Sequence, residues 1–204
     1  MQKKIFFLTL IFLTASVTYA EKNWPASKIG ITFSSFGEND VVRFHELEGA
    51  AGYLPDQFFV FGINYQQPLN KLLDFETGIE YAYHKIIVSP NLPPDVNSAD
   101  YGSSFSLMSI PLSVRLNFLK FCFVHAGLLL DIDADQSSPI DNQTGIGSNL
   151  GIGLNYDFNF GLSLFVNPYF KIHALLPFSM DNYPQRVIES GIRLGILYQL
   201  KKEQ

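Results

Sequence analysis

Hydrophobic and polar residues alternate along most of the chain, in eight stretches separated by segments rich in glycine, proline and polar residues. Successive residues of a β-strand point to opposite faces, so each stretch predicts a strand with one apolar and one polar face. The stretch at 187–200 shows the contrast most clearly. One face is mainly isoleucine, leucine and tyrosine, and the other, from Glu189 onward, is glycine, charged and polar residues with Leu197 as its one apolar member.

The connections between the stretches alternate in length. Long polar segments lie at 37–56, 89–103, 134–144 and 175–186, and short turns lie between them. This alternation is typical of outer-membrane barrels, which have long extracellular loops and short periplasmic turns. We therefore predict an all-β fold, an eight-stranded antiparallel up-and-down transmembrane β-barrel with both termini in the periplasm. The expected strands are 28–36, 57–66, 73–84, 104–118, 121–132, 145–156, 160–174 and 187–200.

Composition separates this prediction from a soluble barrel such as a lipocalin, which has the same alternation but turns its apolar face inward. Charged residues make up 16% of the chain and aromatic residues 15%, whereas ordinary soluble domains carry about 25% charged residues. The polar face of 145–155 consists of glycine and asparagine alone. Such a face suits a crowded interior better than a solvated surface, because glycine weakens a strand unless another group approaches closely. The apolar face is predicted to contact lipid.

Residues 1–20 have the features of a secretory signal peptide, with Lys3 and Lys4 before the apolar run 5–13 and small residues ending at Ala20. The barrel domain would then comprise 21–204, in the outer membrane of a Gram-negative bacterium. The net charge of −5 gives no basic patch, which excludes a nucleic-acid binder. The expected partners are outer-membrane lipid, the barrel-assembly machinery during biogenesis, and an unidentified extracellular or envelope protein.

Two features at the turn end of the predicted strands concern membrane insertion. Gly195, Tyr198 and Leu200, together with the polar Arg193, resemble the C-terminal assembly signal of outer-membrane barrels. Aromatic residues also end every even-numbered strand on its outward face and predict a periplasmic aromatic girdle. They are Tyr65, Phe118, Tyr156 and Tyr198.

Charged residues on the inward faces predict a structural network in the lumen. An eight-stranded barrel has an interior just wide enough for side chains to fill, and an unpaired buried ion is costly. We expect Arg115 and Arg193 to be its centres, since one guanidinium can bridge carboxylates from two strands. Bulky inward neighbours should complete a plugged lumen; they include Lys171, Phe121, Phe123 and Tyr169. The predicted network is Glu76, Glu80, Arg115, Glu189 and Arg193.

Three inward histidines, His84, His125 and His173, are the candidates for chemistry. We interpret them as hydrogen-bonded lumen residues rather than metal ligands. Lipid A deacylases have a serine two residues after the histidine and then an asparagine, and neither His125 nor His173 is followed by that pattern. The segment 131–135 imitates the start of a calcium loop but lacks the glycine and glutamate of an EF-hand, leaving only a looser cation site at the rim as an alternative. No catalytic, cofactor-binding or metal residue is predicted, and no cofactor.

Three segments carry a resemblance to a known family. Met108-Ser-Ile-Pro-Leu-Ser-Val-Arg115 resembles the isoleucine-proline-leucine strand of the PorT-like outer-membrane β-barrel family. Phe123-Val-His-Ala-Gly127 is similar to the strand that follows it, and Gly147-Ser-Asn-Leu-Gly-Ile-Gly153 to the glycine-spaced sixth strand. The resemblance covers about 73–200 and implies an eight-stranded outer-membrane barrel, usually without an assigned molecular activity. Some members are linked to protein secretion or gliding machinery, and others carry a porin-like label.

The function expected from the sequence is that of a small outer-membrane barrel, a structural or surface-interaction module with a plugged polar lumen and any binding carried by its loops. It is not expected to be an enzyme. A narrow passive porin-like pore is the alternative, and a lipid-modifying outer-membrane enzyme is a further one.

Overall fold

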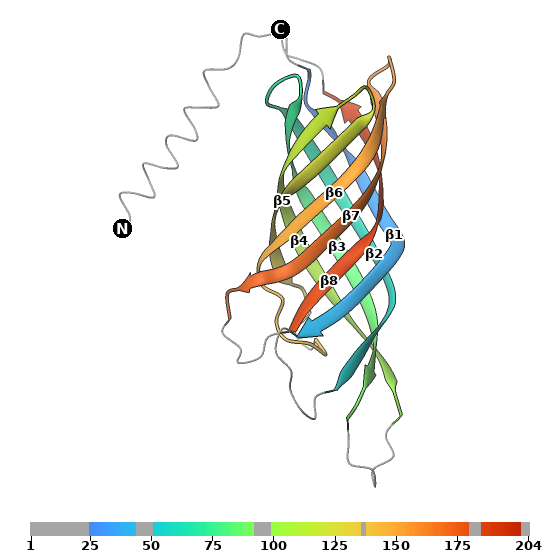
Figure 1. Ribbon diagram of the computed structural model, residues 1–204, viewed down its shortest axis with the longest axis vertical. Coiled ribbons are helices and arrows are strands. Elements are labelled where there is room, and N and C mark those ends of the chain that lie inside the picture. The colour runs from blue at the N-terminus through green and yellow to red at the C-terminus, as the bar shows by residue number, and fades with distance from the viewer. Residues whose placement is uncertain (1–24, 44–50, 92–98, 136–137, 180–184, 201–204) are drawn as a thin grey trace, which may run out of the picture.

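The computed structural model describes residues 25–43, 51–91, 99–135, 138–179 and 185–200, which form one closed barrel (Figure 1). Every strand pairs antiparallel with its neighbours in the sequence, and β1 pairs with β8 to close the ring. The predicted fold is confirmed. The strands are β1 (Lys28–Arg43), β2 (Gly52–Pro68), β3 (Leu73–Ser89), β4 (Tyr101–Phe118), β5 (Cys122–Asp133), β6 (Gly145–Asp157), β7 (Leu162–Pro177) and β8 (Gln185–Gln199).

The two ends of the barrel differ. At the turn end, short connections join β2 to β3, β4 to β5 and β6 to β7, and Leu119 and Gly161 adopt positive φ angles of 55° and 91° in two of these turns. The first and last described segments meet at the same end, where the Leu200 amide donates to the Ser27 carbonyl at 2.7 Å. The longer connections lie at the opposite end, here named the loop end. The predicted signal peptide, 1–20, lies outside the described residues.

The outer wall is apolar and the interior is polar. On β8, Leu194, Ile196 and Tyr198 are 44%, 48% and 52% exposed, whereas Glu189 and Arg193 are buried. Barrels in water have the inverse arrangement, and an outward apolar band belongs to a barrel surrounded by lipid. The fold is therefore a transmembrane β-barrel. In the part of the chain that the structure describes, no helix has the length and apolar character needed to cross a membrane.

Some strands are longer than predicted. The prediction of a loop at 37–56 is wrong for most of these residues. Residues 37–43 belong to β1 and 52–56 to β2. A β-bulge between Ser34 and Phe36 shifts the alternation of β1, so that Thr32 and Ser34 point inward before it and Asn39 and Val41 after it. An extra residue reverses the face to which every later residue points. A prediction that assumes strict alternation is therefore correct only up to the bulge.

The barrel wall is taller on one side. β2, β3 and β4 contain 17, 17 and 18 residues, whereas β5 and β6 contain 12 and 13. About 10 tilted residues cross a membrane, so the long strands extend past it by about 7 residues, or about 20 Å along the strand. Figure 1 shows the ends of β3 and β4 projecting furthest at the loop end, at the bottom of the view.

Candidate functional site

The candidate site is the lumen, where buried charged residues lie between two apolar clusters. Phe123, Phe165 and Leu197 form the turn-end cluster. A larger loop-end cluster fills the opposite half and includes Ile140, which the connection between β5 and β6 contributes to the interior. Buried apolar side chains therefore lie on both sides of the charged residues, toward the turn end and toward the loop end. The loop-end cluster consists of Val41, Phe58, Val60, Ala82, Ile86, Val88, Phe105, Leu107, Ile140 and Val187.

Four of the predicted network residues lie together in the middle of the lumen. Arg193 Nη2 lies 2.8 Å from Glu76 Oε1, and Nη1 lies 3.4 Å from Glu80 Oε1. Lys171 bridges Glu80 to a third carboxylate, with its Nζ 2.7 Å from Glu80 Oε2 and 3.1 Å from Glu189 Oε1. All five side chains are buried. Charges from β3, β7 and β8 are therefore tied into one network across the lumen.

Arg115 differs from its expected role. Its guanidinium carbon lies 3.5 Å from the centroid of the Phe123 ring and 5.9 Å from that of Phe165, and its Nε donates to Asn117 Oδ1 at 3.0 Å. Among the described residues, no carboxylate oxygen lies within 4.0 Å of it. A guanidinium over an aromatic face is attracted by the ring quadrupole. Arg115 therefore belongs with the turn-end cluster instead of forming a second centre for the carboxylates.

Phe121 was expected inside, and the structure corrects this. It lies just before β5, is 42% exposed and stacks on Tyr156 with ring centroids 5.8 Å apart. The inward aromatics at this level are Phe123 and Phe165. The inward position of Phe165 was not predicted, although Phe165 shares the parity of the inward Asn167. An apolar residue was not expected on the polar face of this strand. Hydrophobicity alone does not distinguish an apolar lumen residue from a lipid-facing one.

Inward glycines make room for these bulky groups. A Cβ at Gly153 would overlap the Phe123 ring, and one at Gly195 would overlap the Phe165 ring. Gly151 lies against the His125 imidazole, where a Cβ would come within 2.5 Å of Nε2. Gly195, predicted as part of the assembly signal, thus also has a packing reason to lack a side chain.

The other residues predicted to serve insertion lie at the turn end of the wall. Tyr156 and Tyr198 are each 52% exposed and Leu200 is 39% exposed, while Tyr65 and Phe118 are half-buried. The structure places them at the end of the barrel opposite the long connections. Their roles as girdle and assembly signal stay predictions.

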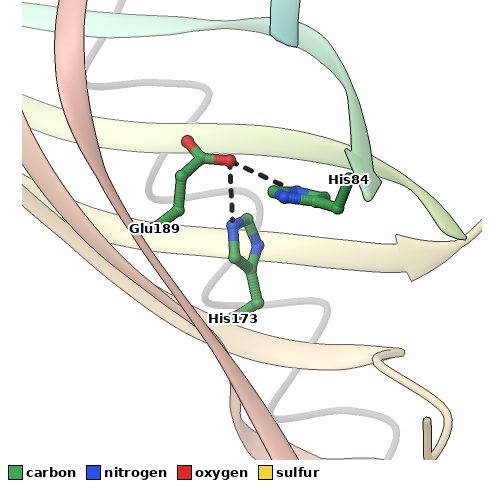
Figure 2. Close-up of side chains that lie close together, drawn as sticks. All are labelled: His84, His173 and Glu189. Carbon is green, nitrogen blue, oxygen red and sulfur yellow. Dashed lines mark ion pairs between the residues drawn. The ribbon is translucent and has the colours of Figure 1, made fainter. Parts of the chain in front are cut away.

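Two of the three inward histidines converge on one carboxylate, as Figure 2 shows. His84 Nε2 lies 3.3 Å and His173 Nε2 3.8 Å from the same oxygen, Glu189 Oε2. All three side chains are fully buried. His125 lies apart from them and shares a hydrogen bond of 2.9 Å with Asn167 Oδ1. Strand parity places all three inside, but only the register between strands shows which two meet.

Asp131 contacts His173 on the side of the imidazole ring away from Glu189. Its Oδ1 lies 3.1 Å from His173 Nδ1 and accepts from the Ser109 hydroxyl at 2.6 Å, and its Oδ2 accepts from the Ala174 amide at 3.0 Å. Asp131 is fully buried, so the alternative of a rim cation site built on 131–135 loses its first residue. Ser109 donates to a carboxylate and not to a histidine, which is not the arrangement of an activated nucleophile.

No family model matches the chain, and no curated protein matches it. Solved structures share its fold, among them those of two outer-membrane proteins. The crystal structure of the outer membrane protein OprG from Pseudomonas aeruginosa is 11% identical, with a TM-score of 0.55, over 88% of this chain and 98% of that one. The outer membrane protein AlkL, solved by solid-state NMR in DMPC lipid bilayers, is 12% identical, with a TM-score of 0.56, over 92% of this chain and 97% of that one. The likeness shows an eight-stranded outer-membrane barrel fold, and the PorT-like resemblance stays a prediction.

Proposed function

We propose that this chain is a small outer-membrane barrel with a closed lumen, acting as a structural or surface-interaction module. The observation that carries the proposal is the filled interior, in which a buried charge network lies between the turn-end and loop-end clusters. A passive pore needs a continuous path for water, and the described side chains leave two apolar barriers in such a path. An ion crossing either barrier would lose hydration against apolar side chains.

The proposed orientation follows from the two ends. The turn end with both termini faces the periplasm, the long connections face the outside, and 1–20 direct export. Outer-membrane lipid covers the apolar wall, and the assembly machinery recognises the last strand. The PorT-like resemblance would add a link to envelope machinery.

The surface-interaction part of the proposal rests on the tall side of the wall. Because β2, β3 and β4 extend past the membrane by about 20 Å along each strand, they present a sheet to the outside instead of a loop alone. Its outer face includes Leu54, which is 51% exposed. A partner protein in the envelope or outside the cell would bind this sheet and the connections beside it.

Conductance in a planar bilayer tests the closed lumen against the pore. The purified wild-type barrel is expected to carry no steady current. Phe123→Ala removes an inward ring of the turn-end cluster, and Phe121→Ala removes an outward ring as the matched control. A steady wild-type current that changes with Phe123→Ala but not with Phe121→Ala would identify a pore through the lumen and overturn the proposal.

A further inference from the structure

We propose that His84, His173 and Glu189 bind a divalent transition-metal ion, with zinc as the best fit, inside the lumen. The site goes beyond the structural role proposed above and does not depend on it. It joins three strands, β3, β7 and β8, near the loop end of the barrel. A metal bound there would link strands that are not all neighbours.

The donor atoms are of the kind that binds a metal ion. Among the described residues, His84 Nε2 and His173 Nε2 contact Glu189 Oε2, and Glu189 Oε1 contacts Lys171 Nζ, but none of these contacts has hydrogen-bond geometry. Buried polar atoms without a hydrogen bond are costly and rare in folded proteins. Imidazole nitrogens with a carboxylate oxygen are a ligand set of zinc sites, and such a set leaves a fourth position open. A metal ion would satisfy both nitrogens and the carboxylate at once.

The distances are close to those of a coordination sphere. Bonds of about 2.0–2.1 Å in a tetrahedral site place neighbouring ligand atoms about 3.3 Å apart. The distance from Glu189 Oε2 is 3.3 Å to His84 Nε2 and 3.8 Å to His173 Nε2. One ligand atom from each residue lies within 4.8 Å of the others. Small side-chain rotations therefore suffice to close the site.

Neighbouring groups already orient both imidazoles. Asp131 contacts His173 Nδ1 at 3.1 Å, which is the carboxylate–histidine arrangement found behind many metal ligands. The His84 ring lies between two phenylalanines, stacked on Phe58 at 5.9 Å and on Phe105 at 5.0 Å between centroids. These contacts hold the two Nε2 atoms facing Glu189, so the geometry is prepared before an ion binds.

The charge balance also favours a cation here. Four carboxylates and two permanent cations are joined by ion-pair contacts in the lumen, together with the two histidines, which leaves 4 − 2 = 2 negative charges when the histidines are neutral. Lys171 contacts Glu189 Oε1 and leaves Oε2 to the histidines. A divalent ion would neutralise these two negative charges. Protonation of both histidines would do the same, so protons compete with the metal ion for the site. The carboxylates are Glu76, Glu80, Asp131 and Glu189, and the cations are Lys171 and Arg193.

Zinc retention by the folded barrel tests the proposal. The full chain is folded in detergent with zinc present, because the closed lumen would slow later entry, and unbound metal is removed before zinc is quantified. Wild type is expected to retain one zinc per barrel. His84→Gln and His173→Gln should each lower retention at least tenfold, whereas His125→Gln, an inward histidine outside the cluster, should retain zinc like wild type. Heat-modifiable gel mobility shows which variants are folded.

X-ray absorption at the zinc edge of the wild type provides a measurement that needs no variant. Nitrogen and oxygen ligands at about 2.0–2.1 Å are expected, including imidazole scattering. Wild-type barrels without stoichiometric zinc would show that protons occupy the site instead. Equal loss of zinc in His125→Gln and His84→Gln, or a spectrum without imidazole, would equally overturn the proposal.

Discussion

Replacing Arg193 by alanine should destabilise the barrel strongly, since its guanidinium supports two acids of the lumen. Glu80 keeps its contact with Lys171 in this variant, at 2.7 Å. Glu76 loses its ion-pair contact at 2.8 Å, and among the described residues it keeps two amide donors, Asn64 at 2.9 Å and Gln66 at 3.4 Å. Breaking a buried pair and leaving one charge behind costs about 3–5 kcal/mol. Because Glu76 keeps its amide donors and Glu80 keeps Lys171, we expect a loss of stability near the lower end of this range.

Urea unfolding, followed by heat-modifiable gel mobility, measures this loss. With a urea dependence of about 1–3 kcal/mol per molar, a loss of about 3 kcal/mol lowers the midpoint by about 1–3 M. Lys28→Ala is the matched control, because Lys28 pairs at 2.6 Å with Asp157, whose side chain is 59% exposed. An exposed ion pair contributes about 1 kcal/mol or less. Adding Glu76→Gln to Arg193→Ala should restore part of the midpoint, since it removes the stranded charge.

Equal midpoints for Arg193→Ala and Lys28→Ala would refute this reasoning. They would mean that water reaches Glu76 and solvates it once the guanidinium is gone, as expected of a hydrated lumen. A double variant no more stable than Arg193→Ala alone would point to lost packing against Phe165, which lies 5.4 Å from the guanidinium.

Three further predictions concern packing, topology and insertion. Gly153→Ala should destabilise the barrel by about 1–3 kcal/mol in urea by overpacking the Phe123 ring, whereas Gly102→Ala, with open space around it, should be neutral. In a cysteine-free background, Gly102→Cys should react with an impermeant thiol reagent on intact cells and Lys120→Cys should not; the reverse would invert the barrel. Tyr198→Asp should reach the periplasm but insert poorly, because charge on the lipid face costs energy; normal folded mobility on a gel would contradict this.

The sequence was sufficient for the strand number, the closed antiparallel order and most of the inward faces. Alternation with a period of two is a local property, and the long and short connections report which end each strand reaches. The prediction failed where the local period breaks. The bulge after Ser34 ended the predicted first strand early, and Phe121 was placed inside because the turn before β5 does not follow the strand parity.

The arrangement within the lumen depends on register, which alternation does not report. Glu189, His84 and His173 are far apart in the sequence and meet because three strands are staggered by a particular amount. Arg115 has the same inward parity as Arg193, yet the stagger places it over Phe123 instead of beside a carboxylate. Leu197 looked anomalous on a polar face and is explained only by its contacts with Phe123 and Phe165.

Reactivity of a thiol placed in the middle of the lumen tests most directly whether the barrel is closed. Ser113 points inward, is 2% exposed and donates to Asn149 Oδ1 at 3.0 Å, and cysteine is close to it in size. In a cysteine-free background, Ser113→Cys in folded barrels should resist a small charged thiol reagent added to both sides and should react fully after unfolding in urea. Reaction in the folded barrel as fast as that of Gly102→Cys at the rim would show a water-filled lumen and contradict the closed barrel proposed here.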